Sequence, residues 1–231
     1  MDGRYPPGVM VTLADCADAA REDEFRRWWD QTVIPGFERT GWIRHTKRFV
    51  NVLADSPTFL GRPRHLLVAE AYRDDLAPAL KAIRRLEAEL WQQGKGFDAV
   101  AAMVNTLYAR TGPQFRTDRS RDKPLGVYAV FCYVKDTTQD AAFNRWYDDK
   151  HMPEALALGF YDTGYRYRIV DARDPDPFQP PYLSLYETSM DPREARDKLV
   201  GERARWYADP DWMHLLGLRY TGGFRQVVPL P

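Results

Sequence analysis

The chain has 231 residues, 44% of them hydrophobic and 13% aromatic, which is enough for one large packed domain or two of ordinary size. Its 33 Lys and Arg residues balance 33 Asp and Glu residues, so the surplus of positive charge that nucleic-acid binding normally needs is missing. No apolar run approaches the roughly 20 residues of a membrane span, and the N-terminus has no apolar signal core. We therefore expect a cytoplasmic protein without a nucleic-acid or membrane partner, whose cysteines, Cys16 and Cys132, are buried free thiols.

An internal repeat runs through the chain with a spacing of 118 residues. The segments FRRWWDQTVIPGFE (25–38) and FNRWYDDKHMPEAL (143–156) share one frame, but Val33 stands where the second copy has His151. Residues that match without a gap include Gly8 and Gly126, Phe25 and Phe143, Trp28 and Trp146, Asp30 and Asp148, and Pro35 and Pro153. The register holds over glycine, proline and tryptophan positions, which indicates a duplication.

Hydrophobic periodicity predicts the order strand, helix, strand, strand, helix, strand in each repeat. In the first repeat these elements are expected at about 8–14, 20–34, 42–53, 65–72, 75–93 and 104–110. In the second repeat they are expected at about 126–134, 138–152, 161–172, 182–188, 191–208 and 218–228. Because Pro153 disfavours the α conformation of the residue before it, the first helix of the second repeat is expected to end at Met152.

This order predicts an α+β fold made of two ferredoxin-like (βαββαβ) repeats. Residues 1–110 are expected to form the first repeat and residues 126–231 the second, joined by a charged linker at 111–125. A ferredoxin-like sheet carries its helices on one face, so the other face is exposed unless it packs on a partner. Two copies in one chain predict that the sheets pack on each other as an intramolecular dimeric α/β barrel.

The segment FNRWYDDKHMPEALALGF resembles the dimeric α/β-barrel superfamily, and its motif residues are similar to the EthD-like branch. The resemblance covers the second repeat well, whereas the first repeat is a degenerate copy that it implies to be scaffold. Members of the superfamily include cofactor-free monooxygenases, cyclases, lactone isomerases, dehydratases and decarboxylases. Some relatives with tandem ferredoxin-like halves bind haem through a histidine. The resemblance therefore implies a barrel with a pocket, and it places the active half in the second repeat.

His151 is the strongest catalytic candidate, because an imidazole titrates near neutral pH and can accept and return a proton. Tyr147 and Asp148 precede it by four and three positions, so both would flank it on an α-helix. A surface histidine at a helix end is the structural alternative. Asp148 has a counterpart, Asp30, in the repeat that lacks the histidine, so a structural role shared by both repeats is equally compatible with the pattern.

The candidate substrate-binding residues are aromatic or polar residues expected around the pocket of the second repeat: Tyr128, Tyr165, Tyr167, Trp146, Glu154 and His214. Aromatic walls with a few hydroxyls suit a planar aromatic ligand, while core packing is the alternative for the rings. A solvated acid and a structural histidine are the alternatives for the two polar residues. Arg48 and Arg166 recur on the other face of their strands and are expected to pair with helix acids.

Dedicated metal and nucleotide sites are not expected. The four histidines form no close pair and there is no cysteine cluster, so no zinc site is predicted. The glycine-rich fingerprints of dinucleotide and nucleoside triphosphate sites are missing. The resulting prediction is a cofactor-independent lyase, decarboxylase, cyclase or isomerase that acts on a hydrophobic aromatic or phenolic molecule through His151. The alternatives are a cofactor-free monooxygenase, a haem-binding tandem barrel and a non-catalytic ligand-binding barrel, each compatible with a homodimer.

Overall fold

Two copies of the predicted element order follow one another in the computed structural model, which describes residues 1–55, 63–121, 123–170, 179–202, 204 and 214–227. The first repeat consists of β1 (Gly8–Cys16), η1 (Ala19–Arg21), α1 (Glu22–Trp28), η2 (Trp29–Val33), α2 (Ile34–Arg39), β2 (Ile43–Asn51), β3 (His65–Ala71), α3 (Ala77–Gln92) and β4 (Val100–Arg116). After η3 (Asp118–Arg121), the second repeat consists of β5 (Gly126–Val134), η4 (Thr137–Gln139), α4 (Asp140–Trp146), η5 (Tyr147–His151), α5 (Met152–Ala157), β6 (Thr163–Ile169), β7 (Tyr182–Thr188), α6 (Pro192–Gly201) and β8 (Leu216–Val227).

The strands of the described residues close into one barrel, in the order β1-β3-β2-β8-β5-β7-β6-β4. Within it, β4-β1-β3-β2 is the ferredoxin-like sheet of the first repeat and β8-β5-β7-β6 that of the second. The two sheets also pair at both edges, β2 with β8 and β4 with β6, in antiparallel register. The prediction of two ferredoxin-like repeats that form an intramolecular barrel is confirmed. Edge pairing leaves neither sheet with an unpaired edge strand.

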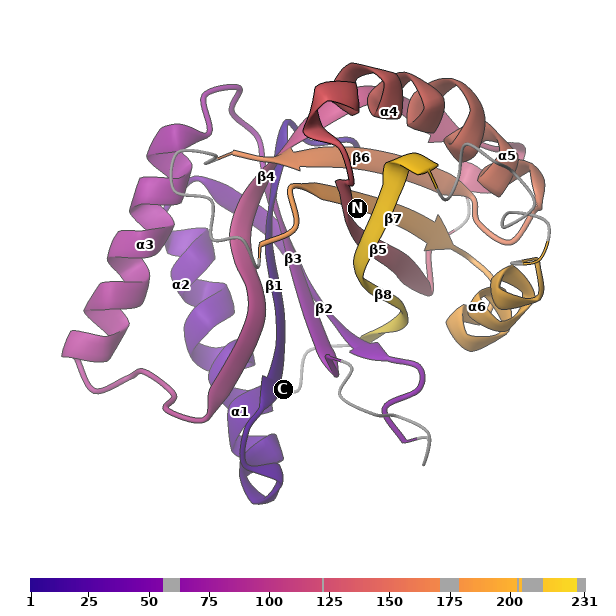
Figure 1. Cartoon of the computed structure of the whole chain (residues 1–231). Coiled ribbons are helices and arrows are strands. Elements are labelled where there is room, and N and C mark those ends of the chain that lie inside the picture. The colour runs from indigo at the N-terminus through magenta and orange to yellow at the C-terminus, as the bar shows by residue number, and fades with distance from the viewer. Residues whose placement is uncertain (56–62, 122, 171–178, 203, 205–213, 228–231) are drawn as a thin grey trace.

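Side chains of each strand alternate between the barrel interior and an outer layer under the helices, because successive strand residues point to opposite faces. The interior cluster combines residues of both repeats, among them Val9 and Val11 of β1 with Tyr165 and Tyr167 of β6. Each repeat buries its other strand face under its own helices. Figure 1 shows α1 to α3 on one side of the strands and α4 to α6 on the other.

The first helical segment of each repeat continues past its proline, so the predicted end at Met152 is wrong. A π-helical turn, η5, joins α4 to α5, and the N–H group of Met152 donates to the carbonyl oxygen of Tyr147. The proline then lies in the first turn of α5. A backbone N–H at this position has no acceptor within the helix, so its absence costs no hydrogen bond. The first repeat has the same arrangement around η2 and Pro35. The wider turn lets the helix accommodate a proline that an α-helix would not.

Two other boundaries differ from the sequence prediction. Strand β4 runs to Arg116, into the stretch expected as a linker, because its second part pairs with β6 and closes the barrel. Helix α6 is described as Pro192–Gly201, and most of the remaining predicted segment, up to 208, lies outside the described residues. Both cysteines are free thiols, as expected, with Cys132 buried and Cys16 half-buried.

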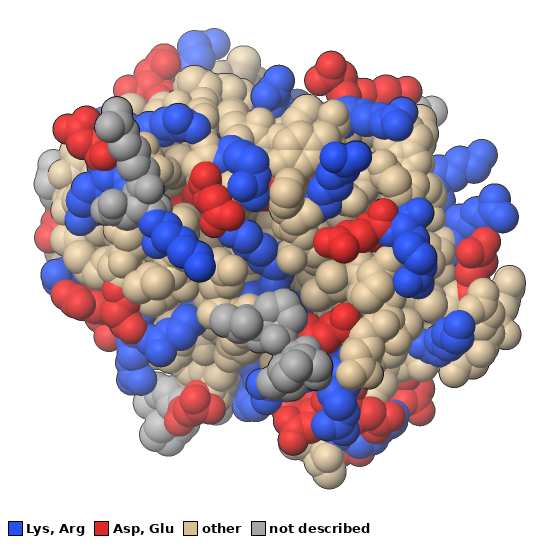
Figure 2. Space-filling view, turned by 180° about the vertical axis from the view of Figure 1, so that it is seen from behind, with Lys and Arg blue, Asp and Glu red and all other residues tan. Residues whose placement is uncertain are grey.

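The surface of the described residues carries both signs of charge. Figure 2 shows Lys and Arg side chains intermixed with Asp and Glu over the face drawn there, rather than gathered by sign. None of the described helices combines the length and apolar character needed to cross a membrane.

Candidate functional site

The π-helical turn η5 places His151 under aromatic rings in the outer layer of the second repeat. The imidazole is 6% exposed. Its ring stacks on Trp146, with centroids 5.1 Å apart and planes at 14°, and meets Tyr147 edge-on at 4.8 Å. Because the turn is wider than an α-helical one, residues five positions apart come to lie over one another. The sequence predicted Tyr147 beside the histidine and Trp146 as a substrate-binding candidate, but it did not predict that Trp146 stacks on the imidazole.

A small cavity adjoins His151 between α5, α6 and the outer face of the sheet. Its volume is about 20 Å³, and its lining residues are Tyr128, Val130, His151, Ala155, Tyr161, Tyr186 and Leu199. Burial raises the pKa of the Tyr161 and Tyr186 hydroxyls, which are therefore neutral. The Tyr161 hydroxyl has no hydrogen-bond partner among the described residues. The space is enough for about one water molecule.

Asp148 is held by an arginine of the neighbouring strand. Its Oδ1 accepts a hydrogen bond from Nη1 of Arg166 at 2.7 Å, and the Arg166 side chain is 1% exposed. In the first repeat, Arg48 makes the same kind of pair with Asp30 through two hydrogen bonds of 2.6 and 2.8 Å. The prediction that both arginines pair with helix acids is confirmed. Since both repeats keep this pair, it attaches the π-helical segment to the sheet.

Tyr165 and Tyr167 lie inside the barrel, on the opposite strand face from the small cavity. The Tyr165 hydroxyl donates to Glu187 at 2.6 Å, and the same carboxylate accepts a hydrogen bond from the α-amino group of Met1 at 2.6 Å. These two tyrosines are therefore part of the barrel core and do not line the small cavity. Two further predicted residues, Glu154 and His214, are exposed and do not line the small cavity. Of the predicted substrate-binding residues, Tyr128 and Trp146 are close to His151.

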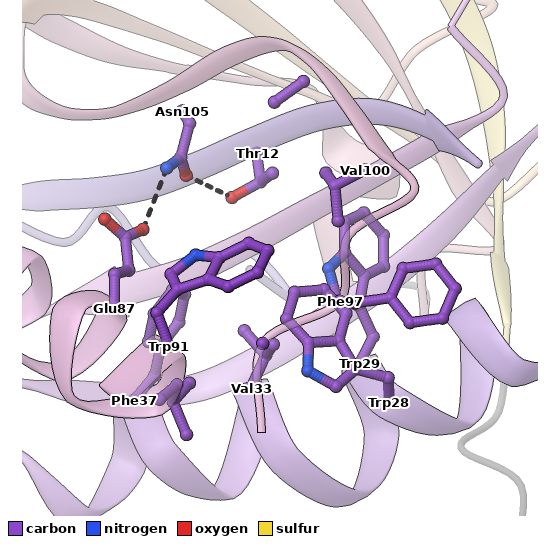
Figure 3. A pocket seen from close by; sticks show the side chains of 13 residues that line it. Thr12, Trp28, Trp29, Val33, Phe37, Glu87, Trp91, Phe97, Val100 and Asn105 are labelled. Carbon is purple, nitrogen blue, oxygen red and sulfur yellow. Dashed lines mark hydrogen bonds between the residues drawn. The ribbon is translucent and has the colours of Figure 1, made fainter. Parts of the chain in front are cut away.

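The first repeat contains a larger cavity at the equivalent place, where Val33 replaces His151 (Figure 3). Its volume is about 190 Å³, and its lining residues are Thr12, Trp28, Trp29, Val33, Phe37, Glu87, Leu90, Trp91, Gly96, Phe97, Val100, Ala102 and Asn105. Trp28 and Phe97 stack with centroids 5.7 Å apart and planes at 28°. We call this space the first-repeat cavity, and the smaller one beside His151 the second-repeat cavity.

Polar side chains gather at one end of the first-repeat cavity, away from Trp28, Trp29 and Phe97 (Figure 3). The Thr12 hydroxyl donates to Oδ1 of Asn105 at 2.9 Å, and Nδ2 of Asn105 donates to Oε1 of Glu87 at 2.8 Å. Arg84 donates to the other carboxylate oxygen of Glu87 at 2.9 Å. Because a carboxylate can only accept, the amide nitrogen of Asn105 must face Glu87 and its oxygen must face Thr12.

Trp91 stands at the mouth of this cavity with 59% of its surface exposed. A Cβ atom on Gly96 would come within 2.5 Å of its indole ring, so the ring can occupy this place because residue 96 has no side chain. The residues that line this cavity were not predicted as a site, because the first repeat lacks the histidine on which the site prediction was based. The signal that could have found them is the density of aromatic residues in FRRWW (25–29) and LWQQGKGF (90–97).

Comparisons with known proteins support the fold. No family model and no curated protein sequence matches this chain. Among solved structures, it is similar to a chlorite dismutase from Candidatus Nitrospira defluvii, with a TM-score of 0.58, 12% identity, and coverage of 98% of this chain and 92% of that one. It is also similar to a dye-decolorizing peroxidase from Bacteroides thetaiotaomicron (0.58, 10%, 99% and 94%) and to a DypB variant from Rhodococcus jostii in complex with heme (0.57, 10%, 97% and 94%). These likenesses show a dimeric α+β barrel, whereas membership of the EthD-like branch stays a prediction.

The comparisons overturn the expected reaction. The structures similar to this chain include chlorite dismutases and dye-decolorizing peroxidases, one of them in complex with heme. The prediction of a cofactor-independent lyase, decarboxylase, cyclase or isomerase is therefore wrong. It rested on the single motif around His151, and that motif is compatible with several chemistries on the same barrel.

One of the similar structures contains heme. This group does not fit the first-repeat cavity or the second-repeat cavity. A haem site needs an axial ligand and space for the macrocycle. The second-repeat cavity has His151, but its volume of about 20 Å³ is that of about one water molecule. The first-repeat cavity has about 190 Å³, but its lining contains no histidine, cysteine, methionine or tyrosine. Of these two cavities, which are formed by described residues, the one with a histidine and the one with more space are in different repeats.

Proposed function

We propose that this protein binds a small planar aromatic molecule in the first-repeat cavity. The observation that supports the proposal is a volume of about 190 Å³ walled by the rings of Trp28, Trp29, Phe37, Trp91 and Phe97. An apolar cavity of about 150 Å³ is enough to bind benzene, so this volume suits a molecule of one or two rings. Aromatic walls add offset or edge-on ring contacts to the gain from burying apolar surface.

The occupant is a substrate in this proposal, because the similar structures bear the names of enzymes. The site then lies in residues 1–110, and the second repeat supports it as the other half of the barrel. The earlier prediction placed the active site in the second repeat, with His151, Tyr147 and Asp148 at its centre. That remains the competing location, and an experiment on equivalent positions of the two repeats separates them.

Calorimetric titration with toluene and naphthalene tests the location. Val33→Phe should fill the first-repeat cavity and weaken binding of both probes by at least about 10-fold, because the added ring takes up the space they need. Ala102→Trp, at an exposed position of the same lining, should block the mouth with less disturbance of the core. His151→Ala, the control at the equivalent position of the second repeat, should leave both affinities unchanged.

Two results would contradict the proposal. If neither hydrocarbon nor phenol binds the unsubstituted protein, the cavity is not a ligand site. If His151→Ala abolishes binding while Val33→Phe and Ala102→Trp bind normally, the ligand lies in the second repeat. Melting temperatures of all variants show whether each is folded, and Ala102→Trp keeps the test valid if Val33→Phe is unstable.

A further inference from the structure

We infer that the first-repeat cavity selects aromatic molecules that carry a hydrogen-bond donor, such as a phenol or an indole, and disfavours aromatic carboxylates. This inference rests on the proposed function and adds the chemical class of the ligand. It comes from the polar end of the cavity, where Thr12, Asn105 and Glu87 form one chain of hydrogen bonds.

The side chains at that end leave acceptor oxygen atoms for a ligand, beside the second N–H of Asn105. The hydroxyl hydrogen of Thr12 is used by Asn105, so the oxygen of Thr12 still offers its lone pairs. One N–H of Asn105 is used by Glu87, and the carboxylate of Glu87 has no donor. A ligand hydroxyl or ring N–H directed at this end therefore finds oxygen atoms that can accept its hydrogen.

Charge at the same end acts against anions. Glu87 contributes a carboxylate that is 28% exposed, and its partner Arg84 is 48% exposed, so the carboxylate is the less solvated charge of the pair. An aromatic carboxylate would bring a second negative charge beside Glu87 and would lose its hydration in an otherwise apolar space. A neutral phenol or indole is not repelled by Glu87 and loses no hydration of a charged group.

The duplication provides an internal contrast for this polar end. Thr12 is 7% exposed on the outer face of β1, between the apolar residues Met10 and Ala14. Its counterpart in the second repeat is Val130, which has nearly the same shape without a hydroxyl. The hydroxyl therefore is not required by the packing of this strand position. It is the feature that gives the first-repeat cavity a hydrogen-bonding end.

Phenol and toluene are matched probes, since they differ by a hydroxyl in place of a methyl group, and phenol is neutral at pH 7. We expect phenol to bind the unsubstituted protein more tightly than toluene, and benzoate to bind more weakly than either. Thr12→Val should weaken phenol binding by about 10-fold, the effect of one hydrogen bond, and leave toluene within about twofold. Glu87→Gln should relieve the exclusion of benzoate. Val130→Thr in the second repeat is the control and should change no affinity.

The outcomes separate this inference from the proposed function. If toluene binds but phenol shows no preference over it, the donor selectivity is wrong while the cavity remains a ligand site. If Thr12→Val weakens toluene and phenol equally, the hydroxyl acts through the structure of the cavity, and the inference is also wrong. If no probe binds, the proposed function fails first. Melting temperatures confirm that each variant is folded.

Discussion

At the scale of single residues, the two repeats differ most where the chain has Val33 in one and His151 in the other. The histidine is packed between Trp146, Tyr147 and the outer face of the sheet, next to space for about one water molecule. The valine lines a cavity nearly ten times larger. The side chain that can transfer a proton is thus at position 151, whereas the space for a ligand is at the equivalent position 33.

This separation predicts how the protein responds to haem. Titration of the protein with hemin should give no stoichiometric Soret shift, because the histidine lacks space and the larger cavity lacks a ligand. Absorbance spectra of the unsubstituted protein and of His151→Ala provide the measurement. A saturable Soret band that disappears in His151→Ala would show that the second-repeat cavity opens and that the haem-binding alternative is right.

At the scale of elements, each π-helical segment is attached to its sheet by an arginine–aspartate pair. Arg48 binds Asp30 with two hydrogen bonds, and their side chains are 2% and 4% exposed. Arg166 binds Asp148 with one, and the Asp148 side chain is 21% exposed. Arg166 also donates to Asn144. The pair in the first repeat is therefore more buried and depends more on its carboxylate.

We expect Asp30→Asn to destabilise the protein more than Asp148→Asn. Removing one partner of a buried pair leaves the other charge uncompensated, at a cost of about 3–5 kcal/mol. Arg166 keeps its bond to Asn144 and Asp148 is partly solvated, so the cost in the second repeat should be smaller. Urea unfolding of both variants measures the two free energies. Equal losses, or a larger loss for Asp148→Asn, would show that burial does not control the strength of these pairs.

At the scale of the whole molecule, a buried carboxylate joins the N-terminal residues to strands β6 and β7 of the second repeat. Glu187 of β7 is 1% exposed and accepts hydrogen bonds from Tyr165 of β6 and from the backbone N–H groups of Asp2 and Gly3. Burial by itself raises the pKa of this carboxyl, but the Met1 amino group and these donors outweigh it and hold the pKa below its ordinary value of 4.5. The N-terminal segment is thereby tied to the second repeat.

The lowered pKa of Glu187 predicts acid sensitivity. A carboxyl whose pKa is lower in the folded than in the unfolded state stabilises the fold above the unfolded pKa, and this contribution is lost as the pH falls through the folded pKa. The melting temperature should therefore decrease progressively below about pH 4.5. Glu187→Gln should melt lower at pH 7 and lose less stability on acidification. An unchanged acid dependence in Glu187→Gln would assign the effect to other carboxyl groups.

The sequence by itself determined the duplication, the order of strands and helices, and the barrel. It could do so because the periodicity of apolar residues is local, and because a constant offset aligns equivalent positions such as Trp28 and Trp146. It also predicted that Arg48 and Arg166 pair with acids of the helices, since both arginines recur at equivalent positions, and the structure identified these acids as Asp30 and Asp148. These features depend on residue type and spacing along one chain segment.

Only the tertiary structure decided where a ligand has space. The π-helical turn that stacks His151 on Trp146 depends on how one helix accommodates a proline against a sheet. Whether a strand tyrosine faces the barrel interior, as Tyr165 does, or the helix layer, as Tyr128 does, depends on strand register. The volume of the first-repeat cavity depends on side chains that come from β1, α1, η2, α2, α3 and β4 and from the segment between α3 and β4. Packing between segments distant in sequence sets that volume, and no local pattern encodes it.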